Sequence, residues 1–245
     1  MGGDGTWTPF HEDVYRSYSW SANICGQKLW RLVAPNQEHL FTDSLGNTIY
    51  DLRNYDPAEF PRFTSAVQYE VVQNPGECLF VPSGWWHQVV NIGHCISINH
   101  NWANAYNLHH LVDRLQRDYR RVVHALRDVA DMDGFAQHCQ LVLRADSGID
   151  HLMFVQFLAH MRRVYVGCSE DQPPPMLAAH PSSVALRQTD PHFWSKGEVG
   201  VALDRIRQAF LRLRDHDPAT RSDPSLCQLI DNELRELDMW ESKVQ

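Results

Sequence analysis

The chain has 245 residues, of which 43% are hydrophobic and 21% are charged, and its net charge is −8. An acidic chain lacks the clustered Lys and Arg that phosphate contacts need, so we expect no direct nucleic-acid partner. No run of 18 apolar residues occurs, which excludes a helical membrane span. The six cysteines lie far apart and form no CxxC pair, so the sequence predicts a reducing compartment, the cytoplasm or the nucleus.

Residues 6–102 have the pattern of β structure. Short runs rich in Val, Ile, Phe, Trp and Tyr are separated by turn signals such as Asn74-Pro75-Gly76. Strands at this spacing, with no helical periodicity between them, predict a sandwich or barrel rather than a parallel α/β sheet. The expected strands are Trp7–Ser19, Ala22–Ala34, Ala66–Val72, Glu77–Val81, Gln88–Asn91 and Cys95–Trp102.

Residues 104–245 have the pattern of helices. Asn107 is expected to cap the first helix, and a Pro-rich loop is expected over residues 168–191, where Pro173-Pro174-Pro175 excludes a helix. The predicted organisation is therefore a β domain over residues 1–105 and a helical region over residues 106–245. We expect the apolar helix faces either to pack on the β domain or to form a homodimer. These faces are indicated by Leu111, Leu115, Tyr119, Val122 and Leu126, by Leu152, Val155 and Leu158, by Leu203, Ile206, Phe210 and Leu213, and by Leu226, Ile230, Leu234 and Leu237.

Two ligand-type side chains stand close together near the start of the chain. If His11-Glu12-Asp13 is a strand, His11 and Asp13 project on the same face, about 7 Å apart along the chain, and Glu12 points the other way. An imidazole and a carboxylate in that arrangement can both bind one divalent metal. The spacing by itself is common, and a lone histidine is more often a surface or core residue than a ligand.

A third ligand is expected after the turn Pro82-Ser83-Gly84. His87 follows two tryptophans there, which places it at the start of a strand beside bulky apolar walls. Together with His11 and Asp13 it completes a set of two histidines and one carboxylate. Such a set leaves three adjacent positions of an octahedral metal open, which suits Fe(II) that binds both a cosubstrate and O₂. Zinc stays an alternative, because residue types alone do not select the metal.

Lys28 lies within an apolar strand and alternates with Trp30 and Leu32. A lysine that points into a barrel is unfavourable unless an anion neutralises it. A dicarboxylate would supply that anion, with its far carboxylate on Lys28 and its 2-oxo acid end on the metal. The alternative is that the side chain of Lys28 reaches the surface, as most lysines do.

Four motifs in this order resemble the jumonji-C family of Fe(II)- and 2-oxoglutarate-dependent oxygenases. The resemblance covers about residues 6–105 and implies a double-stranded β-helix, which is a jelly-roll barrel of the cupin kind. It implies that His11, Asp13 and His87 bind the iron, that O₂ is consumed, and that Lys28 holds the 5-carboxylate of 2-oxoglutarate. Thr8 is implied to bond the same carboxylate, and Asn99 to line the cosubstrate pocket. The motifs are His11-Glu12-Asp13, Gly26-Gln27-Lys28-Leu29-Trp30, Gly84-Trp85-Trp86-His87 and Ile96-Ser97-Ile98-Asn99-His100-Asn101-Trp102.

The same resemblance implies an activity and a partner. An H-x-D pair with a Gly-Trp-Trp-His segment is similar to the protein-hydroxylase branch of the family, and most similar to a subgroup that hydroxylates a lysine of the eukaryotic translation release factor. The expected function is therefore hydroxylation of a protein lysine. Three alternatives stay open: a histone or protein lysine demethylase, a zinc-binding cupin protein, and a binding module without turnover.

The ligand pair lies close to Met1. Members of the family have a strand and an extension before the H-x-D strand, so the resemblance implies a barrel whose N-terminal strands are missing. Such a barrel would have an open edge and uncovered apolar surface. We therefore expect this chain, expressed alone, to be poorly soluble or to have a weakened site.

Overall fold

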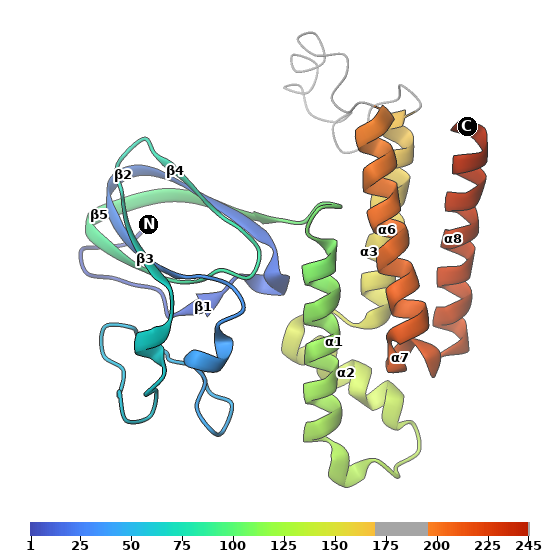
Figure 1. Ribbon diagram of the computed structural model, residues 1–245, viewed down its shortest axis with the longest axis horizontal. Coiled ribbons are helices and arrows are strands. Elements are labelled where there is room, and N and C mark those ends of the chain that lie inside the picture. Colours follow the sequence, from blue (N-terminus) through green and yellow to red (C-terminus); the bar gives the residue numbers. More distant parts are fainter. Residues whose placement is uncertain (170–195, 245) are drawn as a thin grey trace. The chain divides into compact units, whose positions relative to one another are not determined.

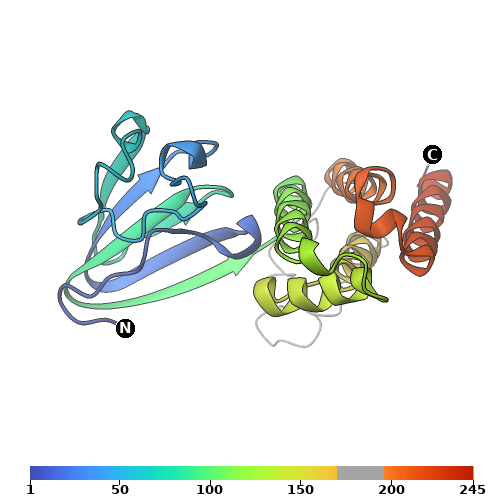
Figure 2. The same cartoon turned by 90° about the horizontal axis from the view of Figure 1, so that it is seen from below.

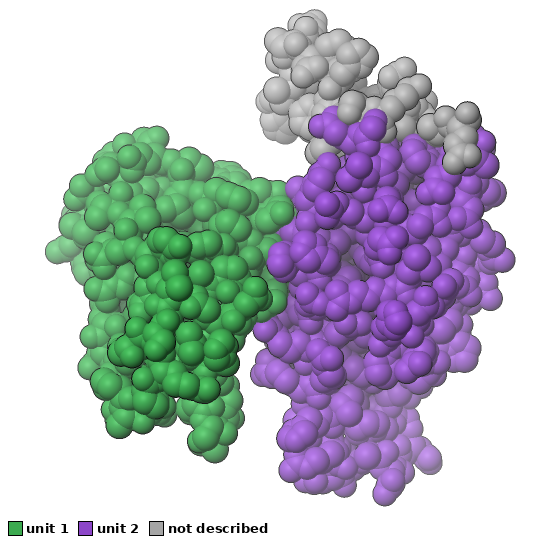
Figure 3. Space-filling view, in the orientation of Figure 1, with its two compact units in different colours: residues 1–103 green, residues 104–245 purple. Residues whose placement is uncertain are grey.

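The computed structural model describes residues 1–169 and 196–244. They belong to two compact units, residues 1–103 and residues 104–245, which Figure 3 draws in different colours. The boundary expected from the sequence follows residue 105. The first two residues of the expected Pro-rich loop, Cys168 and Ser169, end a helix, and the loop from residue 170 onwards lies outside the described residues.

The first unit is an antiparallel sheet that curls into part of a barrel (Figure 1). Its strand order is β1-β5-β2-β3, and β4 pairs with β2. This curled sheet and the helices that follow it confirm the predicted class, a mainly β fold with a helical C-terminal region. The strands are β1 (His11–Glu12), β2 (Tyr18–Val33), β3 (Gln68–Gln73), β4 (Cys78–Val81) and β5 (Trp86–Trp102).

Two long strands, β2 and β5, run the length of the sheet and bend together, as Figure 2 shows from below. Their register shifts around Cys25, next to Gly26, whose φ is +72°. A Cβ on Gly26 would lie 2.5 Å from both the Cys95 sulfur and the His94 carbonyl oxygen, so only glycine fits where the strands approach. This bend divides each strand into two arms.

The inner face of the barrel changes character along β2. In the first arm the inward side chains of Ser19, Ser21 and Asn23 are polar and buried. In the second arm Trp30 and Leu32 form an apolar cluster, completed by Val81 of β4 and Val89 of β5. The first arm therefore gives the interior a polar wall, and Trp30 and Leu32 of the second arm add an apolar one.

The segment between β2 and β3, residues 34–67, covers the outer face behind β1. It includes the 3-10 turns η2 (Glu38–Leu40) and η3 (Phe63–Ser65). Gln88 of β5 fastens this segment, because its side chain accepts a bond from the Leu52 amide at 2.7 Å and donates one to Asp51 at 2.8 Å. The apolar cluster beneath it consists of Phe10, Val33, Phe41, Ile49, Leu52, Phe60 and Phe63.

Several sequence predictions were wrong in detail. The expected strand Trp7–Ser19 is broken into the short strand β1 and the first two residues of β2, because the 3-10 turn η1 (Val14–Arg16) follows directly after Asp13. The expected strands Gln88–Asn91 and Cys95–Trp102 are one strand, β5. Asn107 precedes the first helix, but its side chain accepts a bond from the Asn104 amide instead of capping the helix.

Large apolar side chains are exposed on the outer face of the first arm. Phe80 is 51% exposed and Ile98 is 57% exposed. The rings of Tyr18, Phe80 and Trp102 contact one another there, with centroids 5.4 to 5.7 Å apart.

The second unit is a helical bundle whose apolar stripes meet in a common core. Leu115, Leu158, Ile206, Phe210 and Ile230 are fully buried in it. Leu152, which the sequence pattern places on an apolar helix face, is 47% exposed. Within residues 1–169 and 196–244, no helix has the length and apolar character needed to cross a membrane. The helices are α1 (Leu108–Ala125), α2 (Phe135–Ser147), α3 (His151–Ser169), α6 (Lys196–His216), α7 (Pro218–Arg221) and α8 (Pro224–Val244), with the 3-10 turn η4 (Arg127–Val129) after α1.

A buried polar pair ties two parts of this bundle together. His151 at the start of α3 and Asp217 at the start of α7 are each 1% exposed, and the His151 Nε2 lies 3.2 Å from an Asp217 oxygen. Burial alone raises the pKa of Asp217, but His151 and the amides of Thr220 and Ala219 outweigh it and hold the pKa below its usual value. The carboxylate is thus stabilised in its charged form.

Asp217→Asn should lower the free energy of unfolding at pH 7 by about 1.5–3 kcal/mol, the usual contribution of a hydrogen bond to a charged group. The folded-state pKa of Asp217 is depressed, so its contribution is present above the unfolded value near 3.9 and is lost as the pH falls through the folded value. Urea denaturation should therefore show that the free energies of unfolding of variant and parent differ less near pH 3 than at pH 7.

Asp223→Asn is the matched control. Asp223 accepts bonds from the Ser225 and Leu226 amides at the start of α8, but it is exposed to solvent. Its substitution should change the free energy of unfolding much less, and equal losses in both variants would contradict the role given to burial.

Candidate metal centre

Three ligand-type side chains converge where β1 pairs with the start of β5. The register of this antiparallel pair sets His11 opposite His87, and Asp13 directly follows β1. The two imidazole centroids are 4.3 Å apart. One ring nitrogen from each histidine and one carboxylate oxygen from Asp13 all lie within 4.8 Å of one another. Among the described residues, this is the one group of three or more such side chains that could hold a metal ion.

The orientation of both imidazoles is fixed by backbone carbonyl groups. The Nδ1 of His11 lies 2.7 Å from the Pro9 carbonyl oxygen, and the Nδ1 of His87 lies 3.2 Å from that of Trp85. A carbonyl oxygen only accepts, so each Nδ1 must carry the proton. Each Nε2 therefore keeps its lone pair for a metal, which is the arrangement that outer hydrogen bonds impose on metal-binding histidines.

Asp13 is held from the neighbouring strand. The Ser19 hydroxyl of β2 donates a hydrogen bond of 2.5 Å to its Oδ2. That bond orients the carboxylate and leaves its other oxygen for a metal. Ser19 is itself buried, so its position is set by the strand and not by solvent.

Burial keeps His87 ready to bind a metal. Desolvation, with a smaller repulsion from His11, lowers its pKa to about 4, although Asp13 and the Trp85 carbonyl act in the opposite direction. His87 is therefore neutral at pH 7, and a metal does not need to displace a proton from it.

The triad opens into a cavity of about 470 Å³ inside the barrel. The six site residues expected from the sequence all line it: His11, Asp13 and His87 as ligands, and Thr8, Lys28 and Asn99 as cosubstrate contacts. The remaining lining residues include Thr6, Trp7, Ser19, Trp20, Ser21, Trp30, Val89, Asn91 and Asn101.

Lys28 provides the positive charge of the cavity. Its Nζ donates a bond of 3.2 Å to the Asn91 side chain, which in turn bonds the Thr6 hydroxyl at 2.9 Å. Desolvation lowers the pKa of Lys28, with a small opposing effect from Cys95. A half-buried ammonium group without a carboxylate among these partners favours the binding of an anion.

Two hydroxyl groups that line the same cavity as Lys28 can donate to an anion there. The Thr8 oxygen accepts a bond of 3.1 Å from the Val89 amide, so its own proton is still able to donate into the cavity. The Ser21 hydroxyl is buried and has no hydrogen-bond partner among the described residues. A buried hydroxyl in that state is unfavourable unless a ligand completes it.

These residues fit iron together with 2-oxoglutarate. Two imidazoles and one carboxylate on one side leave adjacent positions of an octahedral ion free. The cavity beside them holds the cation Lys28 and the unpartnered Ser21 hydroxyl, which suit a carboxylate. Glu12 lies outside the ligand group, as its position between the two ligands predicts.

Sequence reasoning missed two contributors to this site. Asn91 bonds Lys28, and it alternates with Val89 and His87 along β5, a spacing that could have revealed it. Ser19 supports Asp13, but only the pairing of distant segments brings them together. No local pattern in the sequence indicates that contact.

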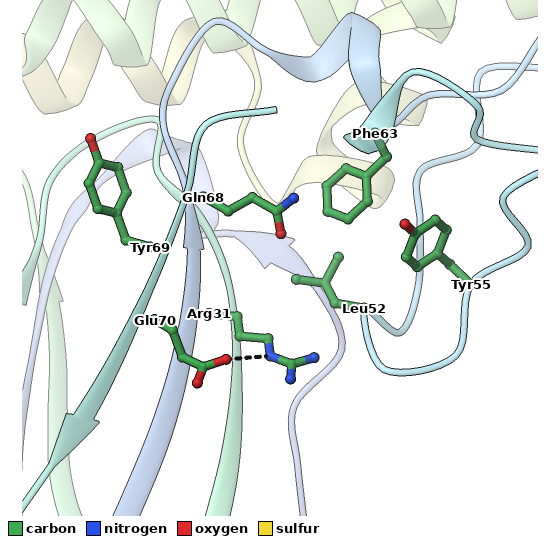
Figure 4. Close-up of a pocket in the computed structure, with 7 residues that line it drawn as sticks. All are labelled: Arg31, Leu52, Tyr55, Phe63, Gln68, Tyr69 and Glu70. Carbon is green, nitrogen blue, oxygen red and sulfur yellow. Dashed lines mark hydrogen bonds and ion pairs between the residues drawn. The ribbon is translucent and has the colours of Figure 1, made fainter. Parts of the chain in front are cut away.

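A second, smaller cavity of about 260 Å³ lies beside β3 (Figure 4). An ion pair of 3.2 Å between Arg31 and Glu70 crosses it. Since it holds none of the three ligand-type residues, the metal chemistry belongs to the larger cavity. Its lining residues are Arg31, Leu52, Tyr55, Phe63, Gln68, Tyr69 and Glu70.

Comparison with known proteins shows which family the first unit resembles. Residues 1–102 match the family model described as JmjC domain, hydroxylase. The chain is 47% identical over 163 residues to the 2-oxoglutarate and iron-dependent oxygenase JMJD4 of Danio rerio. The aligned region covers 64% of this chain and 39% of that relative. The human JMJD4 is 43% identical over 159 residues, covering 63% of this chain and 38% of the relative.

A plant relative is equally similar. The arginine-specific demethylase JMJ20 of Arabidopsis thaliana is 46% identical over 162 residues, covering 65% of this chain and 35% of that protein. The chain thus spans little more than a third of the length of these curated relatives. Residues 1–102 of this chain therefore belong to the JmjC domain family, with its cupin-like barrel.

Proposed function

We propose that this chain is an Fe(II)- and 2-oxoglutarate-dependent oxygenase that hydroxylates a protein. The observation that carries the proposal is that the ligand triad and the cation Lys28 face one cavity. The triad alone would suit several metals, and the lysine alone would suit any anion. Both together suit a cosubstrate that chelates the metal at one end and needs a cation at the other. The names of the JMJD4 relatives support the same chemistry.

A zinc-binding cupin protein is supported less well. Zinc would be satisfied by the triad and one water molecule, and such a site gives Lys28 no purpose. Lys28 is half-buried at a cost in desolvation that an organic anion would offset. The same residue weakens the reading as a silent binding module, because a scaffold needs no anion pocket.

When bound together, iron and 2-oxoglutarate activate O₂ for oxidation of an unreactive C–H bond, with release of succinate and CO₂. Within the chain, Lys28 and the Thr8 hydroxyl hold the far carboxylate and so fix the direction of the cosubstrate. Ser19 keeps the Asp13 carboxylate aimed at the metal position. The chain thus supplies orientation and charge, and the bound groups supply the reactivity.

Trp30 provides an apolar wall beside the metal ligands. The ring of Trp30 lies 5.6 Å from that of His87, and Trp30 is anchored by a bond of 2.9 Å from its Nε1 to Gln73. Gln73, the last residue of β3, in turn donates to the Ser21 carbonyl of β2 at 2.7 Å, so this side chain links the Trp30 wall to the first arm of β2. A dry, rigid wall protects a reactive site from side reactions.

The substrate that we propose is a lysine side chain of a translation release factor. The similarity of the H-x-D and Gly-Trp-Trp-His motifs to the hydroxylase branch supports this choice. The alternative is demethylation, which the similarity to the demethylase JMJ20 supports, because its identity of 46% is close to the 47% of the Danio rerio JMJD4. Both reactions oxidise a C–H bond, but a hydroxyl group placed on an N-methyl carbon is lost with that carbon as formaldehyde.

Mass spectrometry of the products distinguishes the two reactions. With Fe(II), 2-oxoglutarate and O₂, a release-factor peptide should gain one oxygen atom on a lysine, while matched peptides with methylated lysine or arginine should keep their methyl groups. Loss of a methyl group with formaldehyde release would favour the demethylase instead. A parent protein that binds both groups yet leaves all these peptides unchanged would contradict the proposed substrate.

The ligand assignment is tested by anaerobic titration with Fe(II) and 2-oxoglutarate, followed through their charge-transfer absorption. His11→Ala should lower the metal affinity by more than about 100-fold, since outer-shell partners alone change it by 10–100-fold. Lys28→Ala should keep the metal but weaken 2-oxoglutarate binding roughly 10- to 100-fold, as expected for a charged hydrogen bond.

Lys243→Ala, at an exposed position of α8, is the control for the lysine and should titrate like the parent. Addition of a chelator should abolish the absorption band in every protein. If Lys28→Ala bound 2-oxoglutarate as tightly as Lys243→Ala does, the anion pocket would be wrongly assigned.

Ser19→Ala tests the support of Asp13. Loss of the 2.5 Å bond frees the carboxylate to rotate, so the metal affinity should fall on the order of 10-fold. Ser17→Ala removes another buried hydroxyl, one that accepts from Asn101 and does not touch the triad. Equal metal affinities of the two variants in the same titration would contradict the role of Ser19.

A further inference from the structure

A cluster of charged side chains lies directly behind the metal ligands. Glu12, between His11 and Asp13, has a side chain that is only 2% exposed. The Arg16 Nε donates to its Oε1 at 2.5 Å, and the Arg16 side chain is itself only 12% exposed. A buried carboxylate needs such a partner, because an unpaired charge in the interior is very unfavourable.

Arg16 also reaches a second carboxylate. Another nitrogen of its guanidinium group donates to Glu38 of η2 at 2.5 Å. Glu38 belongs to the segment over residues 34–67, which covers the outer face behind β1. One side chain therefore links the strand that carries the ligands to the layer packed against it. The planar fork of arginine suits this double contact, whereas lysine offers a single point charge.

The backbone between Glu12 and Arg16 is strained. Tyr15 and Arg16 have φ values of 56° and 54°, in the left-handed region that favours glycine. These two residues follow Asp13 closely, and the Arg16 amide donates to the Asp13 carbonyl at 3.0 Å. Two non-glycine residues stay in such a conformation only where the surrounding contacts hold them there.

We propose that Arg16 is a positioning residue of the metal centre. By bonding Glu12 on one side of Asp13 and Glu38 in the covering segment, it holds the strained turn closed and keeps the Asp13 carboxylate aimed at the ion. The inference rests on the proposed metal-binding function. A purely structural ion pair would affect only the stability of the fold. If Arg16 is a positioning residue, weakening its two bonds should also alter the geometry of the bound metal.

The test is a titration of the full chain with Co(II), whose visible spectrum reports both affinity and ligand geometry. Arg16→Lys keeps a charge beside Glu12 but cannot make both bonds, so Co(II) affinity should fall about 10-fold, with an altered band shape. Glu38→Gln leaves the Glu12 pair intact and should show a smaller loss of affinity in the same direction.

Arg31→Lys is the matched control, because Arg31 forms an exposed ion pair with Glu70 on the same sheet. It should bind Co(II) like the parent, with an unchanged spectrum. If Arg16→Lys and Glu38→Gln also matched the parent in both affinity and spectrum, the proposal would be overturned. If Arg16→Lys failed to fold, Glu38→Gln would carry the decision, since Glu38 is 27% exposed and its loss leaves no buried charge unpaired.

A metal-free measurement separates this inference from the proposed function. Amide hydrogen exchange over residues 11–17, measured by mass spectrometry, should be faster in Arg16→Lys than in Arg31→Lys. A parent that failed to bind Co(II) would contradict the metal site, and the exchange rates would still decide whether Arg16 holds the turn. Equal exchange in the two variants would show that it does not.

Discussion

The pairing of β1 with the start of β5 is the contact on which the rest of the site depends. Because side chains alternate along a strand, a slip by one residue would set Glu12 opposite His87 and turn the His11 side chain away from the cavity. A strand of two residues has little hydrogen bonding with which to resist such a slip. The register is also held by the residues before the strand, because the Thr8 amide donates to the Val89 carbonyl at 2.9 Å and the Asn91 amide donates to the Thr6 carbonyl at 2.8 Å. On the outer face, the packing of Phe10 in the apolar cluster and the buried Glu12 side chain support the same register.

The polar interior of the barrel reverses the usual preference for an apolar core. Ser19, Ser21 and Asn23 are buried along one arm, whereas the hydrophobic packing of this unit lies in the other arm and beneath residues 34–67. A polar lining contributes less to folding than apolar side chains of the same size would, because each buried polar atom needs a partner. This loss of stability occurs where a charged cosubstrate would complete the hydrogen bonds of the polar lining.

The sequence contains the alternation of the strands but not their long-range partners. Period-two spacing correctly placed His11 with Asp13 and Lys28 with Trp30 on the cavity wall, because that spacing is a property of the strand itself. It could not reveal the turn after Asp13, since Tyr15 and Arg16 carry no turn signal and take left-handed φ values only under tertiary constraint. The sequence pattern placed a break between Asn91 and Cys95, yet β5 runs through that point, where its register with β2 shifts. The partnership of Ser19 with Asp13 depends on the fold as a whole.

The carbonyl groups that orient the two imidazoles lie only two residues before each histidine. Each ring therefore acquires its orientation from its own short segment, and only the meeting of the two rings requires the sheet. A metal ion that binds both rings consequently favours the paired state over the unpaired one, by an amount that grows with the logarithm of its free concentration. Folding and metal loading are thus linked equilibria, and the shortest strand of the barrel gains the most from the ion, since it has the fewest hydrogen bonds of its own.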